Sequence, residues 1–444
     1  MAPSAADPGS AWPAQWAAHV ADIRDDCEPR ESAERLRRLI KSKLLLFTDM
    51  QTDPRKFFLA HRMLVDPKTR GPGFWIRFTV QYNLFAGTVL GLGGPEHVAK
   101  LAEMQSKGQL GCFGLTEKLA GVNSGLVVNT TATWVPEAQR FVLHSPNEGA
   151  YKNWISQGFH ADFCAVIADL RVAGKSHGPH AFLMALRDES GRVARGVTLI
   201  DMGRKSIANS LDNVAIGFDR VELPRSALLN RFADVENDAY VQKTAERMRI
   251  EIIGQRLLTG RVAVAQAALE FCSKLVALTR AYAERKQCWS PGGTVALITI
   301  PHIHAVFADA DARLAHMSEY MAHVESKLSE SLVRAAIPDA RTVEAIAVGK
   351  VSAVETAIDL SFRLKQEVGS YALMGGAGFE NMGAAQGSWR AAAPAARATD
   401  ATSTRLFAVL QVRGGRLARA DAEARARPVP RVPGQRQVGD DPRS

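Results

Sequence analysis

Two short segments in the first half of the chain carry residue types suited to holding a polar ligand. The first runs from Gly111 to Gly125 and has the sequence GCFGLTEKLAGVNSG. It predicts a strand that ends at Thr116 and Glu117, followed by a loop of small and hydrogen-bonding residues. Such a loop can present backbone N–H groups and hydroxyls to a polar ligand.

The second segment runs from Asn153 to Gly158 and has the sequence NWISQG. Here an aromatic plate, Trp154, precedes Gly158, a residue that permits close approach of another group to the backbone. Two interpretations stay open at this stage. Trp154 contacts a ligand, or it is a core residue beside a turn.

Two glycine-rich stretches, Gly87–Gly94 and Gly375–Gly378, do not satisfy the dinucleotide-binding fingerprint. That fingerprint requires a strand before the glycines, a helix after them and an acidic residue about 20 positions further on. By spacing alone, each stretch favours helix packing or a turn.

Histidine and cysteine spacings exclude the common metal and nucleophile motifs. The chain contains no H-E-x-x-H, no G-x-S-x-G and no P-loop lysine. His302 and His304 would face apart on a helix, so no metal site is expected. His177 and His180 flank a predicted turn at Gly178-Pro179 and are expected on the surface. No C-x-x-C pair occurs among the five cysteines, which suggests a reducing compartment: Cys27, Cys112, Cys164, Cys272 and Cys288.

Composition indicates a globular protein. The 444 residues are 46% hydrophobic and 23% charged, which allows two or three packed units of about 150 residues each. Residues 391–444 hold ten Arg, no Lys and five acidic residues, so more than half of the net charge of +9 lies there. A basic tail therefore explains the charge better than a nucleic-acid surface. No run of 18 apolar residues and no basic-then-apolar leader occurs, so neither a membrane span nor a secretory signal is expected.

Hydrophobic periodicity divides the chain into three regimes. Helical signals dominate residues 31–109, with starts at Asp53-Pro54 and Gly94-Pro95 and a buried helix over Phe74–Leu92. Short strands with polar turns follow: Arg140–His144, Asp162–Ala168, His180–Leu186 and Val197–Ile200. Long helices are expected over Thr244–Gln287, between Pro301 and Pro338, and over Asp339–Glu367.

The predicted fold class is α+β, because interleaved βαβ units are absent and a doubly wound fold is disfavoured. We expect an N-terminal α-helical domain over residues 1–109 and a central antiparallel β-barrel over 110–235. A C-terminal helical bundle is expected over 236–382 and an Ala/Arg-rich, disordered tail over 383–444.

The change of texture after Met382 is abrupt. The last lysine is Lys365, and from Gly383 the chain consists largely of Ala, Arg, Pro and Gly. This composition is typical of a GC-rich coding region translated in the wrong frame. One hypothesis is therefore a frameshift or a misplaced splice junction near codon 383.

Seven segments in order resemble the acyl-CoA oxidase family, within the wider acyl-CoA dehydrogenase superfamily. The resemblance runs from about Leu44 to Met382. The segments are Phe57–Arg62, Gly111–Glu117, Thr130–Thr133, Phe141–Pro146, Trp154–Gly158, Tyr282–Gln287 and Gly375–Phe379. The Thr130–Thr133 and Phe141–Pro146 segments point to the oxidase branch.

The resemblance implies the same three-part fold and a bound FAD between barrel and bundle in a homodimer. It implies that Thr116 contacts the flavin ring, that Gly158 brings its backbone to it, and that Trp154 packs near its face. Arg285 would reach the FAD pyrophosphate of the neighbouring subunit, a role that suits a guanidinium; as an alternative, it caps helix carbonyls. Gly375 and Gly376 would let the partner's adenosine approach.

The implied reaction is α,β-dehydrogenation of a fatty acyl-CoA to trans-2-enoyl-CoA, in fatty-acid β-oxidation. In oxidases O₂ is then reduced to hydrogen peroxide, whereas in dehydrogenases a flavoprotein accepts the electrons. Oxidases of this type are usually peroxisomal, although the C-terminus Asp-Pro-Arg-Ser is no peroxisomal address of the Ser-Lys-Leu kind.

One departure concerns the catalytic base. The family places its catalytic Glu in a Glu-Gly segment shortly after the Gly-Gly-x-Gly segment. In this chain Glu380 follows the glycines directly, and the next Glu is Glu423. No residue is assigned as the base, and a catalytically impaired relative that binds FAD and acyl-CoA is a further alternative.

Overall fold

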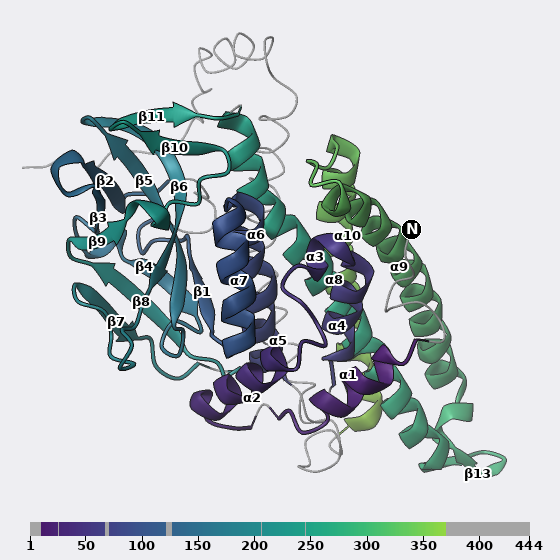
Figure 1. The fold of residues 1–444 in the computed structure, drawn as a ribbon. Helices are drawn as coiled ribbons and strands as arrows, with labels where there is room; N and C mark the ends of the chain where they lie inside the picture. The colour runs from purple at the N-terminus through teal and green to yellow at the C-terminus, as the bar shows by residue number, and fades with distance from the viewer. Residues whose placement is uncertain are drawn as a thin grey trace, which may run out of the picture.

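The computed structural model describes residues 10–369 except 25, 67–70, 121–126, 206 and 245, and no side chain at 246–250, 256 or 368. Along the chain, helices come first, strands second and long helices third (Figure 1). The predicted α+β order is confirmed. Gly375, Gly376 and the segment 383–444 lie outside the described residues.

Two of the N-terminal helices begin where the signals at Asp53-Pro54 and Gly94-Pro95 predict. Asp53 caps one of them by accepting a hydrogen bond at Oδ1 from the Lys56 N–H, at 3.2 Å. Gly108 ends another with φ of 68°, a left-handed conformation that glycine adopts without strain. The elements are α1 Trp12–Val20, α2 Pro29–Lys41, α3 Asp49–Thr52, α4 Pro54–Met63, α5 Pro72–Thr79, a π-helical turn η1 Val80–Phe85, α6 Ala86–Leu92 and α7 Pro95–Lys107.

The buried helix predicted over Phe74–Leu92 is confirmed as the continuous series α5, η1 and α6. The glycine-rich stretch Gly87–Gly94 covers α6 and the turn before α7, and its residues are buried. The helix-packing interpretation of these glycines is therefore confirmed.

The central part of the chain forms strands. They are β1 Gly111–Gly114, β2 Thr131–Val135, β3 Arg140–His144, β4 Lys152–Ser156, β5 Phe163–Val172, β6 Lys175–Ala185, β7 Val197–Asp201, β8 Asn213–Phe218, β9 Val221–Pro224, β10 Ala233–Glu236 and β11 Ala239–Gln242. Six of them form one sheet in the order β1-β5-β2-β3-β9, with β6 on the other edge of β5. A second sheet has the order β4-β8-β7, and β10 pairs with β11.

The larger sheet is mixed, which corrects the prediction of a purely antiparallel arrangement. β1 runs parallel to β5 at Phe163–Val166, and β2 runs parallel to β5 at Asp169–Arg171. Both occupy successive stretches of the same edge. Local turn signals reveal hairpins, whereas parallel neighbours are joined by long connections that leave no local signal.

Strand β5 is the centre of the structure. Cys164, Val166 and Leu170 face the core shared by the strands, whereas Ala165 and Ile167 face the core shared with the helices. Burial on both faces explains why this strand is a continuous apolar run rather than an alternating one.

The C-terminal part consists of three long helices and one hairpin. Asp339 caps the last helix by accepting a hydrogen bond from the Thr342 N–H at 2.7 Å. The hairpin lies where the sequence analysis predicted no strands. The elements are α8 Glu246–Arg285, β12 Gln287–Ser290, β13 Gly293–Ala296, α9 Pro301–Val333 and α10 Ala340–Val368.

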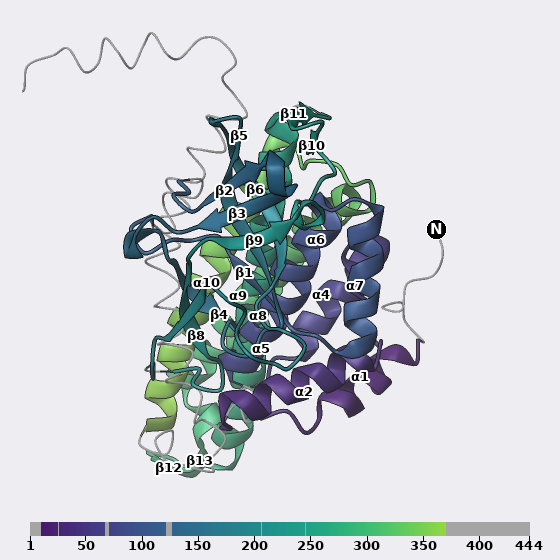
Figure 2. The same cartoon turned by 60° about the vertical axis from the view of Figure 1, so that its left-hand side comes forward.

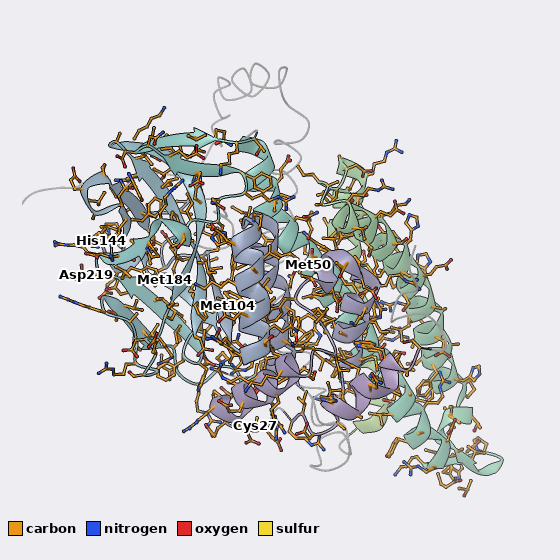
Figure 3. The ribbon with its side chains drawn as sticks, in the orientation of Figure 1. Cys27, Met50, Met104, His144, Met184 and Asp219 are labelled. Carbon is orange, nitrogen blue, oxygen red and sulfur yellow. The ribbon has the colours of Figure 1, made fainter. Side chains whose placement is uncertain are left out.

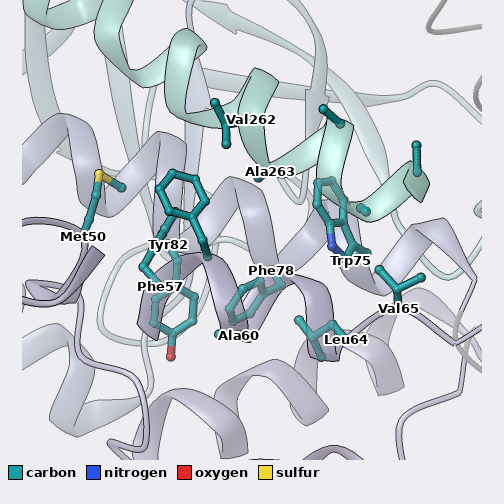
Figure 4. Packing of buried hydrophobic residues seen from close by; sticks show 14 of the residues in the cluster. Met50, Phe57, Ala60, Leu64, Val65, Trp75, Phe78, Tyr82, Val262 and Ala263 are labelled. Carbon is teal, nitrogen blue, oxygen red and sulfur yellow. The ribbon is translucent and has the colours of Figure 1, made fainter. Parts of the chain in front are cut away.

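Helix α8 connects the two ends of the molecule. The β10–β11 hairpin precedes it at one end, and the β12–β13 hairpin follows it at the other (Figure 2). At its middle, Val262 and Ala263 pack close to the N-terminal aromatic residues Phe78 and Tyr82 (Figure 4). The N-terminal and C-terminal helices therefore share one hydrophobic core.

The same helix contains, over Glu251–Arg285, a stretch long and apolar enough to cross a bilayer by length and composition. Of its most apolar window, 67% is buried inside the protein. Burial of this kind is typical of a core helix, which passes the same test of length and hydropathy.

The prediction for His177 and His180 was wrong. Both lie within β6 rather than in a turn, and only 1% of His180 is exposed. The His177 ring stacks on the ring of Tyr240 with centroids 3.9 Å apart. The dipeptide Gly178-Pro179 is typical of a turn. Here it lies in β6, opposite a shift of the β5–β6 register between Asp169 and Arg171, and a strand tolerates glycine and proline at such an irregularity.

Candidate functional site

The two segments predicted to bind a ligand lie side by side. The Thr116 hydroxyl donates a hydrogen bond to the Asn153 carbonyl at 2.9 Å, and the Asn153 N–H donates to the Thr116 carbonyl at 2.9 Å. The end of β1 and the start of β4 are thereby joined. Trp154 and Gly158 follow on the same stretch of chain, so the structure brings these three predicted residues together.

Trp154 is not a core residue, which excludes the structural alternative considered for it. Its side chain is 56% exposed, and its φ of 62° lies in the left-handed region that a bulky residue rarely adopts. The register of β4 against β8 shifts between Lys152 and Ile155, so Trp154 lies on a bulge. Bulges redirect side chains and are common beside active sites.

Gly158 is required by packing inside the protein. A Cβ at this position would lie 2.4 Å from Cγ2 of Val214, closer than any real contact. The neighbouring Gln157 has φ of 70°, so the chain turns sharply here. This geometry accounts for the glycine without a ligand, and the predicted approach of its backbone to a flavin stays a prediction.

The sequence analysis missed a buried ion pair next to these residues. Lys152 Nζ lies 2.9 Å from Glu117 Oε1, and both side chains are fully buried. Burial alone would raise the pKa of Glu117, but the charge of Lys152 and the N–H groups of Thr130 and Asn129 hold this pKa below its ordinary value. Burial lowers the pKa of Lys152, and Glu117 counters this effect.

A second buried network was also missed, and it holds the turn that contains Gly158. Arg77 is completely buried on α5, and its Nη2 donates to Asp212 Oδ1 at 3.0 Å and to the Ser210 carbonyl at 2.9 Å. Asp212 also accepts from the Phe159 N–H at 2.7 Å, and its Oδ1 lies 2.9 Å from Nδ1 of His160.

The electrostatics of this network favour a charged carboxylate. Burial alone would raise the pKa of Asp212, but His160, Arg77 and the Phe159 N–H together lower it to about 2. Sequence spacing offered no signal for this network, because Arg77, His160 and Asp212 each lie more than 50 positions from one another.

Arg285 lies elsewhere, at the end of α8 beside the β12–β13 hairpin (Figure 1). Its side chain is exposed, and its Nε donates to the Ala281 carbonyl at 3.0 Å. This contact is the helix capping that was considered as an alternative. The role proposed toward a neighbouring subunit stays a prediction.

The Phe141–Pro146 segment, which pointed to the oxidase branch, lies on β3 and just after it. His144 and Asp219 lie together on the side of the strands that faces away from the helices (Figure 3), with His144 Nδ1 3.8 Å from Asp219 Oδ1. Phe141 and Leu143 of this segment lie in the core shared by the strands.

A cavity of about 1000 Å³ lies between α4, α8 and α9, away from Thr116 and Trp154. At its wall, Arg62 Nη1 lies 2.5 Å from Glu325 Oε2, which also accepts a hydrogen bond from Gln266. Of the predicted flavin contacts, the four that the structure describes (Thr116, Trp154, Gly158 and Arg285) do not line this cavity. It is therefore distinct from the candidate site.

Known structures share this architecture. Acyl-CoA oxidase 1 of Yarrowia lipolytica matches 83% of this chain and 56% of its own with a TM-score of 0.65 and 22% identity. Glutaryl-CoA dehydrogenase of Mycobacterium smegmatis matches 84% of this chain and 88% of its own with a TM-score of 0.65 and 18% identity. Acyl-CoA oxidase-2 of Caenorhabditis elegans was solved with FAD, ascaroside-CoA and ATP. It matches 85% of this chain and 59% of its own with a TM-score of 0.61 and 21% identity. The chain therefore has the fold of the acyl-CoA dehydrogenases and oxidases.

Curated sequences narrow this class. The chain is 30% identical over 284 residues to an acyl-coenzyme A oxidase-like protein of Mus musculus, covering 62% of this chain and 44% of that protein. It is 34% identical over 257 residues to the peroxisomal acyl-coenzyme A oxidase 2 of Arabidopsis thaliana, covering 55% of this chain and 36% of that protein. No family model matches the chain. The chain is therefore similar in sequence to acyl-CoA oxidases, and it spans less than half the length of these two relatives.

Proposed function

We propose that the chain is a FAD-dependent acyl-CoA oxidase-like protein. The proposed reaction converts a fatty acyl-CoA to trans-2-enoyl-CoA and reduces O₂ to hydrogen peroxide. The observation that carries the proposal is Trp154, an exposed aromatic residue on a bulge beside Thr116. Nothing in the packing of the described residues accounts for this exposed ring, whereas a flat ligand does.

The residues present fit FAD. Because the Thr116 hydroxyl directs its hydrogen to the Asn153 carbonyl, its oxygen is left as an acceptor for a ring N–H. Trp154 offers its face to the ring system. Arg285 is placed at an exposed helix end, where its remaining guanidinium N–H groups suit a pyrophosphate of a neighbouring subunit. Bound FAD supplies the hydride acceptor for dehydrogenation.

A second candidate is a relative that binds FAD and acyl-CoA without turning the substrate over. It is favoured by the absence of a Glu-Gly segment after Gly378. Removal of the α-proton requires a positioned carboxylate, and losing a general base typically lowers a rate by about 10² to 10⁴.

The two candidates are separated by anaerobic mixing of the purified, FAD-loaded chain with a long-chain acyl-CoA while the flavin absorbance is followed. Bleaching is expected for an oxidase-like enzyme, and admission of O₂ should restore the absorbance and release hydrogen peroxide. Bleaching that O₂ does not reverse indicates a dehydrogenase that needs a flavoprotein acceptor. A yellow protein that does not bleach supports the binding relative.

The contribution of Trp154 is tested by Trp154→Ala. We expect the dissociation constant for FAD to rise about 5-fold, since aromatic stacking contributes on the order of 1 kcal/mol. Phe362→Ala is the matched control, because Phe362 is an exposed aromatic residue of α10. Equal effects of the two substitutions would count against a flavin contact at Trp154.

A homodimer and a peroxisomal location are part of the same proposal. The dimer is supported by the family resemblance and by the exposed position of Arg285. The peroxisomal location is supported by the name of the Arabidopsis relative, a peroxisomal acyl-coenzyme A oxidase. Sedimentation analysis of the FAD-loaded chain and imaging of a tagged chain test the two statements.

A further inference from the structure

The Glu117 carboxylate, just after β1, bonds to the residues that come just before β2. Its Oε2 accepts hydrogen bonds from the Asn129 N–H at 2.8 Å and from Asn129 Nδ2 at 3.0 Å. Its Oε1 accepts from the Thr130 N–H at 2.9 Å. A single side chain therefore joins the end of β1 to the start of β2.

Lys152 connects Glu117 to β4, the next strand of the site. Its Nζ donates to Glu117 Oε1 at 2.9 Å and to the Leu115 carbonyl at 3.3 Å. Lys152 is the first residue of β4, and Trp154 follows two positions later. The ion pair therefore spans the two segments that carry Thr116 and Trp154.

Stability alone does not explain this pair. Two well-packed apolar residues of similar volume often stabilise a protein as much as a buried ion pair does. A buried pair with directional hydrogen bonds, in contrast, selects one register and one orientation of the segments it joins. Here the selected arrangement is that of the chain at Thr116 and Glu117 against the bulge of β4.

We propose that the Glu117–Lys152 pair is a positioning device for the flavin site, which holds Thr116 and Trp154 at a fixed separation across the ends of β1 and β4. This inference rests on the proposed FAD-binding function. The two side chains are buried and do not touch the ligand themselves. They act through Thr116 and Trp154.

The test is the double variant Glu117→Gln/Lys152→Met in the full chain, which keeps side-chain volume and removes both charges together. We expect the dissociation constant for FAD to rise about 10-fold or more, because small misplacements of a binding group are costly. The fine structure of the visible flavin spectrum should change as well.

The matched control is Asp49→Asn/Lys56→Met. This pair is also largely buried, with Lys56 Nζ 2.8 Å from Asp49 Oδ2, but it joins α3 to α4. The control is expected to lower the melting temperature without changing FAD affinity or the flavin spectrum. A merely structural role for Glu117 and Lys152 predicts the same behaviour in both double variants.

The other outcomes of this experiment distinguish failure of the positioning inference from failure of the proposed FAD-binding function. A folded Glu117→Gln/Lys152→Met variant with unchanged FAD affinity and spectrum overturns the inference. An unmodified chain that binds no FAD overturns the proposed function and this inference with it. If the double variant does not fold, Asn129→Ala replaces it. The exposed Asn129 side chain donates a hydrogen bond to Glu117, so its removal weakens the hold on the carboxylate and leaves both charges in place. Its expected result is weaker FAD binding at an unchanged melting temperature, and unchanged binding overturns the inference.

Discussion

His61 makes the stability of the chain depend on pH in a window that can be stated in advance. Its ring is completely buried, and Nδ1 lies 2.8 Å from the Phe57 carbonyl, where it can donate a hydrogen bond. The rings of Trp75 and Phe78 lie with their centroids 5.7 and 4.7 Å away. Burial lowers the pKa of His61 from 6.5 to about 4; the Phe57 carbonyl opposes this change and the charge of Arg62 adds to it.

The direction of this pH dependence follows from proton binding to His61 in the folded and unfolded chain. Below pH 6.5 the unfolded chain binds a proton at His61, whereas the folded chain stays neutral there until about pH 4. The stabilising contribution is therefore complete above the unfolded pKa and is lost as the pH falls toward the folded one. The loss amounts to about 2 kcal/mol at pH 5 and about 3 kcal/mol when it is complete.

The measurement is urea unfolding, followed by circular dichroism at pH 7.5 and pH 5, of the chain and of His61→Leu. The substitution removes the titration, so the variant should lose about 2 kcal/mol less than the chain does between the two pH values. His19→Gln is the control, because His19 is exposed on α1. An unchanged pH dependence in His61→Leu refutes the reasoning, whatever its stability at pH 7.5.

Three other outcomes are expected. Gly158→Ala should destabilise the chain by about 1–3 kcal/mol, because its Cβ would meet Val214, and Val214→Ala should recover part of this loss in urea unfolding. Asp212→Asn should cost about 3–5 kcal/mol at pH 7, since it leaves the buried charge of Arg77 without its carboxylate. Below pH 3.8 the difference in unfolding free energy between the chain and Asp212→Asn should shrink. The lowered pKa of Asp212 stabilises the folded chain fully only above the unfolded pKa of 3.8, and this stabilisation is lost as the pH falls toward 2. Sequencing of the transcript should show a shifted reading frame near codon 383, and an uninterrupted frame contradicts the frameshift hypothesis.

Much of the fold was predictable because its signals are local. Asp53 and Asp339 cap helices through their own backbone neighbours, and Gly108 ends a helix by its own conformation. The apolar run of β5 was also recognisable as a central strand. Its partners were not, since pairing of β1 and β2 with β5 depends on segments far apart in the chain.

The candidate site was predictable only in part. Thr116 and Trp154 belong to motifs that a family resemblance identifies, and only the structure shows that their segments adjoin. Glu117 was visible as a residue of the motif, but its partner Lys152 lies 35 positions away and nothing in the spacing connects the two. Trp154 could equally have been a core residue until its exposure was known.

The sequence by itself determined the helix–strand–helix order, the approximate bounds of the three long C-terminal helices and of α7, and the residue types available for a flavin site. These features follow from hydrophobic period, capping and turn chemistry, which act over a few residues. The tertiary structure decided the mixed sheet, the outward position of Trp154, and the burial of the Glu117–Lys152 and Arg77–Asp212 pairs. Burial and long-range pairing depend on which distant segments meet, and a charged residue has the same local signature whether it ends in water or in the core.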